Sequence, residues 1–394
     1  MRFDRWDLWG IQQSGNPVVF TAEYTDYIFG SNSCLFLVAA AFDDLFCQVD
    51  GEGRILKVEQ NLKKTLRTAS NVNSLLLILF YAFVYGGAFL IQLILPQIID
   101  ETTTYYTALH ELCVFLFQYV ITVPVLLLIF RAVLGKKIGW KLKDSYRKPQ
   151  ASAGQLVRWC LIALGLIYAT SFFSNIFFNI IQLMTGVELH APSMVAEQNW
   201  LGYLTNFLAF SVLAPLFEEM LFRATLFRNA ERFGGWFAVI MVGIFFGLWH
   251  GNYAQIIYAA MLGICTAFLT AKTRSVLPAM AVHFIMNLIG AIQSIAYSGI
   301  DINDPDYMNP SYWMEHIGNF AVIGLMVMVV MGLLLTGIIL FIIELVKHRE
   351  TFHLENTVPQ VSGGKKALVY LTAPVTVICV IGLLAMTIWN AIGY

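Results

Sequence analysis

Charged side chains are scarce in this sequence of 394 residues: 12% are Asp, Glu, Lys or Arg, whereas 58% are hydrophobic. Soluble globular domains contain about 25% charged residues. The formal net charge of -1 gives no global basic surface, so we expect no nucleic-acid partner. Together with a mean hydropathy of +0.69, this composition predicts a polytopic membrane protein.

Several sequence signatures of known chemistry are missing. The 6 cysteines are scattered without CxxC or CxH spacing, which indicates packing residues and neither disulfides nor metal ligands. No G-x-S-x-G elbow and no H-E-x-x-H pattern occurs. Neither a serine nucleophile nor a standard zincin is therefore indicated.

The first 70 residues differ from the rest of the chain because they are polar, aromatic and charged. They contain no positively charged start leading into a long apolar core, so no cleavable signal peptide is indicated. Residues 46–50 and 54–58 flank Gly51-Glu52-Gly53, a pattern that predicts two short strands joined by a glycine turn. We expect residues 1–70 to form a small soluble cytoplasmic segment with a β-hairpin, where a partner could bind.

Apolar runs fill the chain after residue 70. A spanning helix needs roughly 20 apolar residues. Nine runs qualify as candidates, at about 74–95, 108–130, 158–184, 201–227, 236–251, 254–271, 276–298, 318–344 and 367–391. The fifth and sixth are short and could instead form one re-entrant hairpin. The predicted fold class is an all-α polytopic membrane protein with about eight or nine transmembrane helices in a transmembrane domain over residues 71–394.

Basic residues recur on one side of these runs. Lys63, Lys64 and Arg67 precede the first run, and a group of Lys and Arg between residues 136 and 148 follows the second. Acidic residues such as Asp100 fall on the other side. The positive-inside rule therefore predicts an integral membrane protein whose N-terminus is cytoplasmic.

The fourth apolar run contains three charged residues in a segment where burial of charge is costly: Glu218, Glu219 and Arg223. Glu219 and Arg223 are four residues apart, so on a helix they share a face and can form an ion pair. Glu218 points about 100° away and lacks that partner. A carboxylate without a cation in apolar surroundings suits a general acid or base, although hydrogen bonds between helices would also explain all three residues.

Two further polar clusters lie in later runs. His250 ends the fifth run with Phe246 one turn before it, and His283 and Asn287 stand one turn apart in the seventh. Taken alone, a His at the end of a span is more often a satisfied interfacial residue, and the second pair fits two unrelated helix contacts. Together with Glu218, the clusters supply a carboxylate and an imidazole to activate water and donors to stabilise an oxyanion, as peptide hydrolysis requires.

The three patterns E-E-x-x-x-R, F-x-x-x-H and H-x-x-x-N, in this order on membrane helices, resemble the CPBP family. Its members include CAAX prenyl endopeptidases and bacteriocin-processing, Abi-type proteins. The resemblance covers a catalytic core at roughly residues 155–300 and leaves residues 1–70 and the last two spans unmatched. It implies an intramembrane glutamic endopeptidase of the bacterial cytoplasmic membrane, with a peptide or membrane protein as substrate in preference to a prenylated one.

The same resemblance implies roles for individual residues. Glu218 would be the general base, His250 would help to position the attacking water, and His283 with Asn287 would form the oxyanion hole. The other residues of the three patterns would have structural or orienting roles, namely Glu219, Arg223 and Phe246. We expect this site to lie within the membrane and to be reached through a water-filled cavity in the lipid bilayer.

Metal dependence and two other functions stay open. Two Glu, two His and an Asn could ligate zinc, but His and Glu dispersed over three helices without a helical His pair are a weak zinc pattern. We therefore predict a mechanism without metal or cofactor, with zinc as the alternative. A non-catalytic scaffold or bacteriocin-immunity factor would keep the cluster for structure, and a proton-coupled transporter would use it as a relay. No inverted repeat favours the transporter.

Overall fold

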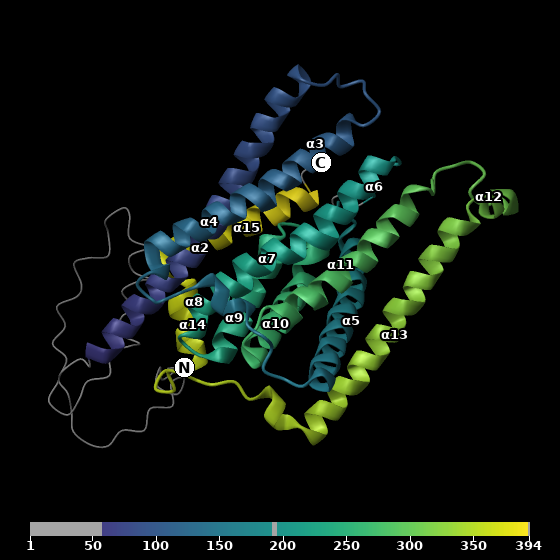
Figure 1. The fold of residues 1–394 in the computed structure, drawn as a ribbon. Helices are drawn as coiled ribbons and strands as arrows, with labels where there is room; N and C mark the ends of the chain where they lie inside the picture. Colours follow the sequence, from purple (N-terminus) through teal and green to yellow (C-terminus); the bar gives the residue numbers. More distant parts are fainter. Residues whose placement is uncertain (1–56, 191–194, 393–394) are drawn as a thin grey trace, which may run out of the picture. The chain divides into compact units, whose positions relative to one another are not determined.

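The computed structural model describes residues 57–190 and 195–392, and no strand occurs in those ranges. The chain divides into two units, Met1–Gln60 and Asn61–Tyr394. Apart from the first residues of one helix, everything described below belongs to the second unit. Its architecture is a bundle of long helices joined by short connections (Figure 1).

Eight helical stretches in the described ranges are long and apolar enough to cross a membrane. They are Gln60–Gln97 (most of α2, Lys57–Ile94), Tyr106–Gly135 (α3, Tyr106–Leu116, to η4, Arg131–Gly135), α5 (Ala153–Thr185), Trp200–Glu231 (α6, Trp200–Asn206, to α8, Arg228–Glu231), α10 (Tyr253–Thr273), α11 (Leu277–Ser298), α13 (Ile317–Lys347) and α15 (Pro374–Ile392). At 1.5 Å per residue, even the 19 residues of α15 extend about 28 Å, close to the thickness of the hydrocarbon core. The predicted all-α polytopic fold class is confirmed.

The fifth predicted span is shorter than a membrane crossing. It forms α9 (Gly235–Trp249), whose 15 residues extend about 22 Å. Helix α9 packs against α10 after the connection 250–252, and the two backbones approach closely at Gly247. A Cβ atom on Gly247 would lie 2.3 Å from the carbonyl oxygen of Ile256, so a glycine is required at this crossing.

The predicted β-hairpin is not supported. Residues 46–56 lie outside the described residues, and Lys57 and Val58, the end of the expected second strand, are the first residues of α2. The predicted domain boundary at residue 70 falls inside this helix. The soluble, cytoplasmic character of the preceding residues stays a prediction.

The last predicted span, 367–391, consists of two helices. Helix α14 (Gly363–Leu371) ends before Thr372 and Ala373, and α15 begins at Pro374. Proline has no backbone N–H to donate, and its ring disfavours the helical conformation of the preceding residue. The break is therefore explained by one residue that is visible in the sequence.

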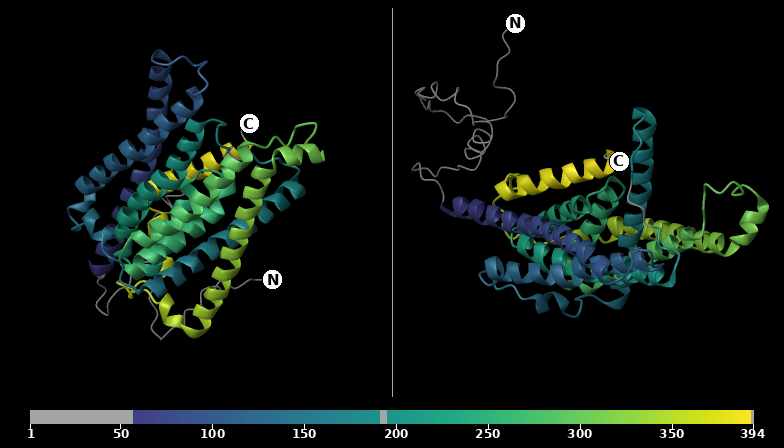
Figure 2. Two further views of the ribbon diagram at one scale, coloured as in Figure 1. Left: turned by 45° about the vertical axis from the view of Figure 1, so that its right-hand side comes forward. Right: turned by 90° about the horizontal axis from the view of Figure 1, so that it is seen from above.

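Helix α13 packs against α5, and the left view of Figure 2 shows the two helices crossing. The two helices cross where Gly165 meets Gly337, and a Cβ atom on Gly165 would lie 2.5 Å from the Cα atom of Gly337. Close approach of small residues is a common way to pack helices in a bilayer, where lipid offers no hydrophobic drive for association.

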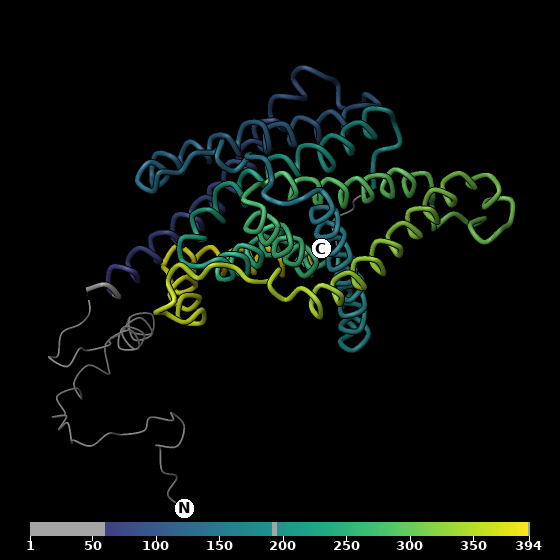
Figure 3. The backbone as a smooth tube through the Cα atoms, turned by 60° about the horizontal axis from the view of Figure 1, so that its bottom comes forward, coloured from purple at the N-terminus to yellow at the C-terminus, as the bar shows by residue number. Residues whose placement is uncertain are grey.

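Buried hydrogen bonds join α2, near the start of the described chain, and α14, near its end, to the segment around residues 226–229. Figure 3 traces the backbone of these helices. Asn73 on α2 donates from Nδ2 to the Leu226 carbonyl at 3.1 Å and to the Tyr370 hydroxyl at 2.8 Å. Asn229 donates from Nδ2 to Asn73 Oδ1 at 2.8 Å. Because unpaired buried amides are costly, this network holds α2 and α14 against the helix that bears the glutamate pair.

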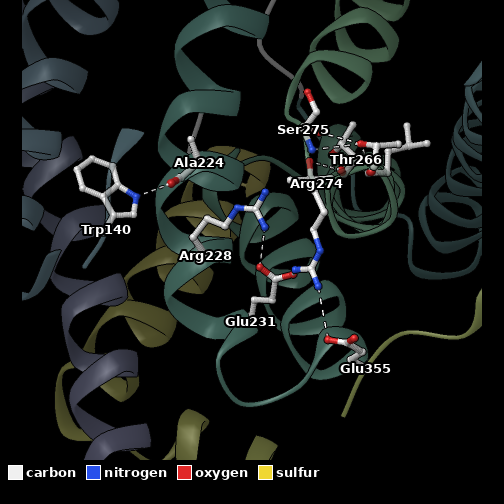
Figure 4. A network of polar contacts seen from close by, with 11 residues as sticks. Trp140, Ala224, Arg228, Glu231, Thr266, Arg274, Ser275 and Glu355 are labelled. Atoms are coloured by element: carbon white, nitrogen blue, oxygen red, sulfur yellow. Dashed lines mark hydrogen bonds and ion pairs between the residues drawn. The ribbon is translucent and has the colours of Figure 1, made fainter. Parts of the chain in front are cut away.

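At one end of the unit, two arginines and two glutamates form an ion-pair network (Figure 4). Arg228 Nη1 and Arg274 Nη1 lie 2.7 and 2.9 Å from the carboxylate of Glu231, and Arg274 Nη2 lies 3.5 Å from Glu355. Arg228 directly follows the fourth apolar run, and Arg274 lies between the sixth and the seventh. The network is consistent with a polar membrane boundary there, and the orientation of the chain stays a prediction.

Candidate active site

The glutamate pair lies on a short α-helical segment between two π-helical ones. Glu218 and Glu219 belong to α7 (Ala214–Leu221), which follows η6 (Phe207–Leu213) and precedes η7 (Phe222–Phe227). π-helical turns are rare, and they occur frequently at functional sites. The helix that supplies the two carboxylates is therefore irregular on both sides of them.

Side chains from other parts of the chain donate hydrogen bonds to carbonyl groups in these π-helical segments. Asn287 Nδ2 donates to the Phe210 carbonyl in η6 at 2.8 Å. Trp140 Nε1 donates to the Ala224 carbonyl in η7 at 2.7 Å, a bond visible in Figure 4. Where the backbone ladder changes from i+4 to i+5 pairing, a carbonyl is left for another donor, so the irregular turns offer attachment points to neighbouring helices.

Glu219 and Arg223 form a buried ion pair. Arg223 Nε lies 3.1 Å from Glu219 Oε2, and both side chains are 0% exposed. Arg223 Nη2 also donates to Thr266 Oγ1, and its guanidinium carbon lies 4.2 Å from the centre of the Phe246 ring. The hydroxyl group and the aromatic face provide part of the solvation that the arginine loses by burial.

Glu219 has a second partner that the sequence did not predict. Its Oε1 lies 2.9 Å from His283 Nδ1. An ionised carboxylate only accepts hydrogen bonds, so Nδ1 is the donor. His283 Nε2 then points toward Glu218, at 3.9 Å from Oε2. Glu219 therefore joins Arg223 to His283, and it orients that imidazole toward the other glutamate.

The two carboxylate oxygens of Glu218 have different surroundings. Oε1 accepts a hydrogen bond of 2.9 Å from the hydroxyl group of Tyr119. Oε2 has no hydrogen-bond partner among the described residues, because His283 Nε2 is too distant at 3.9 Å. One oxygen is held by the phenol, and the other is buried without a hydrogen-bond partner among the described residues.

His250 follows the last residue of α9, and its tautomer can be assigned. Its Nδ1 lies 2.7 Å from the Phe246 carbonyl one turn earlier. A carbonyl oxygen only accepts, so Nδ1 carries the hydrogen and Nε2 of the neutral ring is left as an acceptor. The imidazole can therefore accept a hydrogen bond from water.

A single cavity of about 490 Å³ joins these groups. The four residues assigned catalytic roles line it together with Tyr119, namely Glu218, His250, His283 and Asn287. The residues assigned orienting roles are not part of its lining, namely Glu219, Arg223 and Phe246. Glu218 and His250 make no direct hydrogen bond in the described structure, which leaves the space between them to water or a peptide.

Tyr119 is the residue at this site that the sequence did not reveal. It lies 99 positions before Glu218, on a different helix, and no spacing rule connects them. The local signal is weak, because a tyrosine in an apolar span is ordinary and only Gln118 beside it marks a polar position.

The arrangement is a poor match to a metal site. No three His, Cys, Asp or Glu side chains within the described ranges are placed to hold a metal ion. The metal-free mechanism stays a prediction that chelation can test.

Comparison with known proteins agrees with the three sequence patterns. A curated relative, "Putative membrane peptidase YdiL" of Bacillus subtilis (strain 168), is 27% identical over 86 residues, which are 22% of this chain and 35% of that protein. The match thus spans about a third of the relative's length. No solved structure matches the chain. The family model described as "Type II CAAX prenyl endopeptidase Rce1-like" matches residues 200–289, a range that includes Glu218 and Asn287. Residues 200–289 of this membrane-helix bundle are therefore similar to Rce1-like type II CAAX prenyl endopeptidases.

Proposed function

We propose that this chain is an intramembrane endopeptidase that hydrolyses membrane-associated peptides or proteins with a water molecule activated by Glu218. The observation that supports this most directly is that Glu218, whose Oε2 has no hydrogen-bond partner, lines the same cavity as His250, His283 and Asn287. The family match supports a peptidase over a scaffold, an immunity factor or a transporter.

The first step is the addition of water to the peptide bond. Glu218 Oε2 takes a proton from the water, and His250 Nε2 accepts a hydrogen bond from the same molecule and orients it. The water oxygen forms a bond to the carbonyl carbon of the peptide, and the carbonyl oxygen becomes an oxyanion. Collapse of this intermediate breaks the C–N bond, and the proton held by Glu218 passes to the leaving amine.

Asn287 is the best oxyanion donor in the cavity. Its amide nitrogen carries two hydrogens, and only one is needed for the Phe210 carbonyl. His283 can donate to the oxyanion only when its ring is doubly protonated. Its Nδ1 hydrogen goes to Glu219, and Nε2 carries a hydrogen only in that doubly protonated form. A preorganised donor of this kind contributes about 10²–10³ in rate in other enzymes of acyl transfer.

Purified protein in liposomes would be tested with a pooled library of quenched fluorescent peptides, half with a prenylated cysteine and half without. We expect wild type to cleave members of the unprenylated half and Glu218→Gln to lose at least a hundredfold in rate, as expected when a general base is removed. The matched control is Glu111→Gln, because this exposed glutamate lines a different cavity. Unchanged cleavage by Glu218→Gln at normal protein level would leave a non-catalytic role for the cluster.

Substrate identity in cells would be approached through the membrane peptidome. Cells that express wild type should contain peptide fragments that are missing in cells that express Glu218→Gln. Fragments that end in prenylated cysteine would instead assign the substrate class that the family model's description names.

A further inference from the structure

The contact between Tyr119 and Glu218 brings a residue from outside the matched domain to the proposed general base. Tyr119 lies in η3 (Phe117–Thr122), a π-helical segment that continues α3. The side chain is 4% exposed, and its ring stacks on Phe217 with centroids 6.3 Å apart. The phenol is thus held by packing, independently of its hydrogen bond.

The hydrogen bond distinguishes the two oxygens of Glu218. The Tyr119 hydroxyl donates to Oε1 at 2.9 Å, so that oxygen already has a donor in place. A proton taken from water then goes to Oε2, the buried oxygen that has no partner, on a residue that lines the cavity.

No other described contact fixes the orientation of this carboxylate. His283 Nε2 is 3.9 Å away, beyond hydrogen-bond distance, and Arg223 pairs with Glu219. A glutamate side chain has three rotatable bonds, so its carboxylate keeps one orientation only if some group holds it. In this cavity Tyr119 is that group.

We propose that Tyr119 is a positioning residue for hydrolysis: it holds Glu218 through Oε1 and thereby makes Oε2 the oxygen that takes the proton from water. This inference rests on the proposed function. The residue acts through Glu218 and does not itself contact the peptide. Its role explains why α3 and η3, which the family model does not cover, contribute to the cavity wall.

The test compares Tyr119→Phe with wild type, using a peptide that wild type cleaves. The variant keeps the ring and its packing, and it removes only the hydroxyl group. A hydrogen bond to a charged group is worth enough to change kcat about tenfold to a hundredfold, and KM should stay within about twofold because peptide contacts are unchanged. Tyr168→Phe is the matched control, since the Tyr168 hydroxyl is buried without a hydrogen-bond partner.

A second measurement detects the contact directly. The infrared band of the Glu218 carboxyl group, assigned by its absence in Glu218→Gln, should move in Tyr119→Phe and stay in place in Tyr168→Phe. A kcat of Tyr119→Phe equal to that of wild type, or an unmoved band, would overturn the inference and leave the proposed function intact. Failure of wild type to cleave any peptide would overturn the proposed function, and the inference with it.

Discussion

Removal of Glu219 should be among the most destabilising single changes in the bundle. The variant Glu219→Leu leaves the Arg223 guanidinium, 0% exposed, without its carboxylate. It also leaves the Nδ1 hydrogen of His283 without the acceptor that now lies at 2.9 Å. Breaking a buried ion pair costs about 3–5 kcal/mol, and an unpaired buried donor adds about 1–3 kcal/mol. The expected loss is roughly 4–8 kcal/mol, comparable to the whole stability of many proteins.

The double variant Glu219→Leu with Arg223→Met should be more stable than Glu219→Leu alone. It removes the arginine that the single change leaves unpaired, and a well-packed apolar pair often replaces a buried ion pair at little cost. The remaining loss is the bond to His283, together with the bond from Arg223 to Thr266. We expect recovery of about 2–4 kcal/mol relative to the single variant.

The free energies of unfolding would be measured by SDS titration in mixed micelles for wild type, the two single variants and the double variant. The double-mutant cycle isolates the coupling between the two side chains. Asp144→Asn is the control, because its partner Arg147 is 65% exposed and such surface pairs contribute at most about 1 kcal/mol. Additive losses in the cycle would refute the conclusion that Arg223 depends on Glu219 for its burial.

Three further predictions follow from the cavity and the helix crossings. Asn287→Ala should lower kcat about 10²–10³-fold while KM changes little, since it removes the oxyanion donor; an unchanged kcat would exclude that role. Gly247→Ala should lower the midpoint of thermal unfolding, because its Cβ would clash with the Ile256 carbonyl at a cost of about 1–3 kcal/mol, whereas Gly332→Ala, with open space around it, should not. Finally, peptide cleavage by wild type should survive a strong chelator; a loss that zinc restores would replace the metal-free mechanism with a zinc-dependent one.

Much of the fold follows from hydrophobic length. Because the bilayer fixes how many apolar residues a span needs, the long helices can be located from the amino-acid sequence alone. The differences concern where a helix begins or breaks. Pro374 divides the last apolar run into two helices. The effect of a proline on the preceding residue is enough to predict this break from the sequence. Helix α2 begins at Lys57 among polar residues, where hydropathy gives no signal.

The site was predictable where one helix supplies both members of a contact. The spacing of Glu219 and Arg223 places them on one face, and the structure pairs them at 3.1 Å. The contacts from Glu219 to His283 and from Tyr119 to Glu218 join different helices. Such contacts depend on how the helices pack against one another. No spacing of residues in a single sequence encodes that packing.

The π-helical segments further limit what a regular helical periodicity can predict here. Tyr119 and Arg223 both lie in such segments, where each turn contains more than 3.6 residues and side-chain directions drift from the regular pattern. Tyr81, on α2, makes another contact that no sequence spacing predicts. Its hydroxyl donates to the Trp249 carbonyl next to His250. Helices outside residues 200–289 thus contact Glu218 and the backbone next to His250. Since Tyr119 lies outside that range, the matched domain by itself lacks the group that orients its own proposed base, whereas Phe246 within it orients the imidazole of His250.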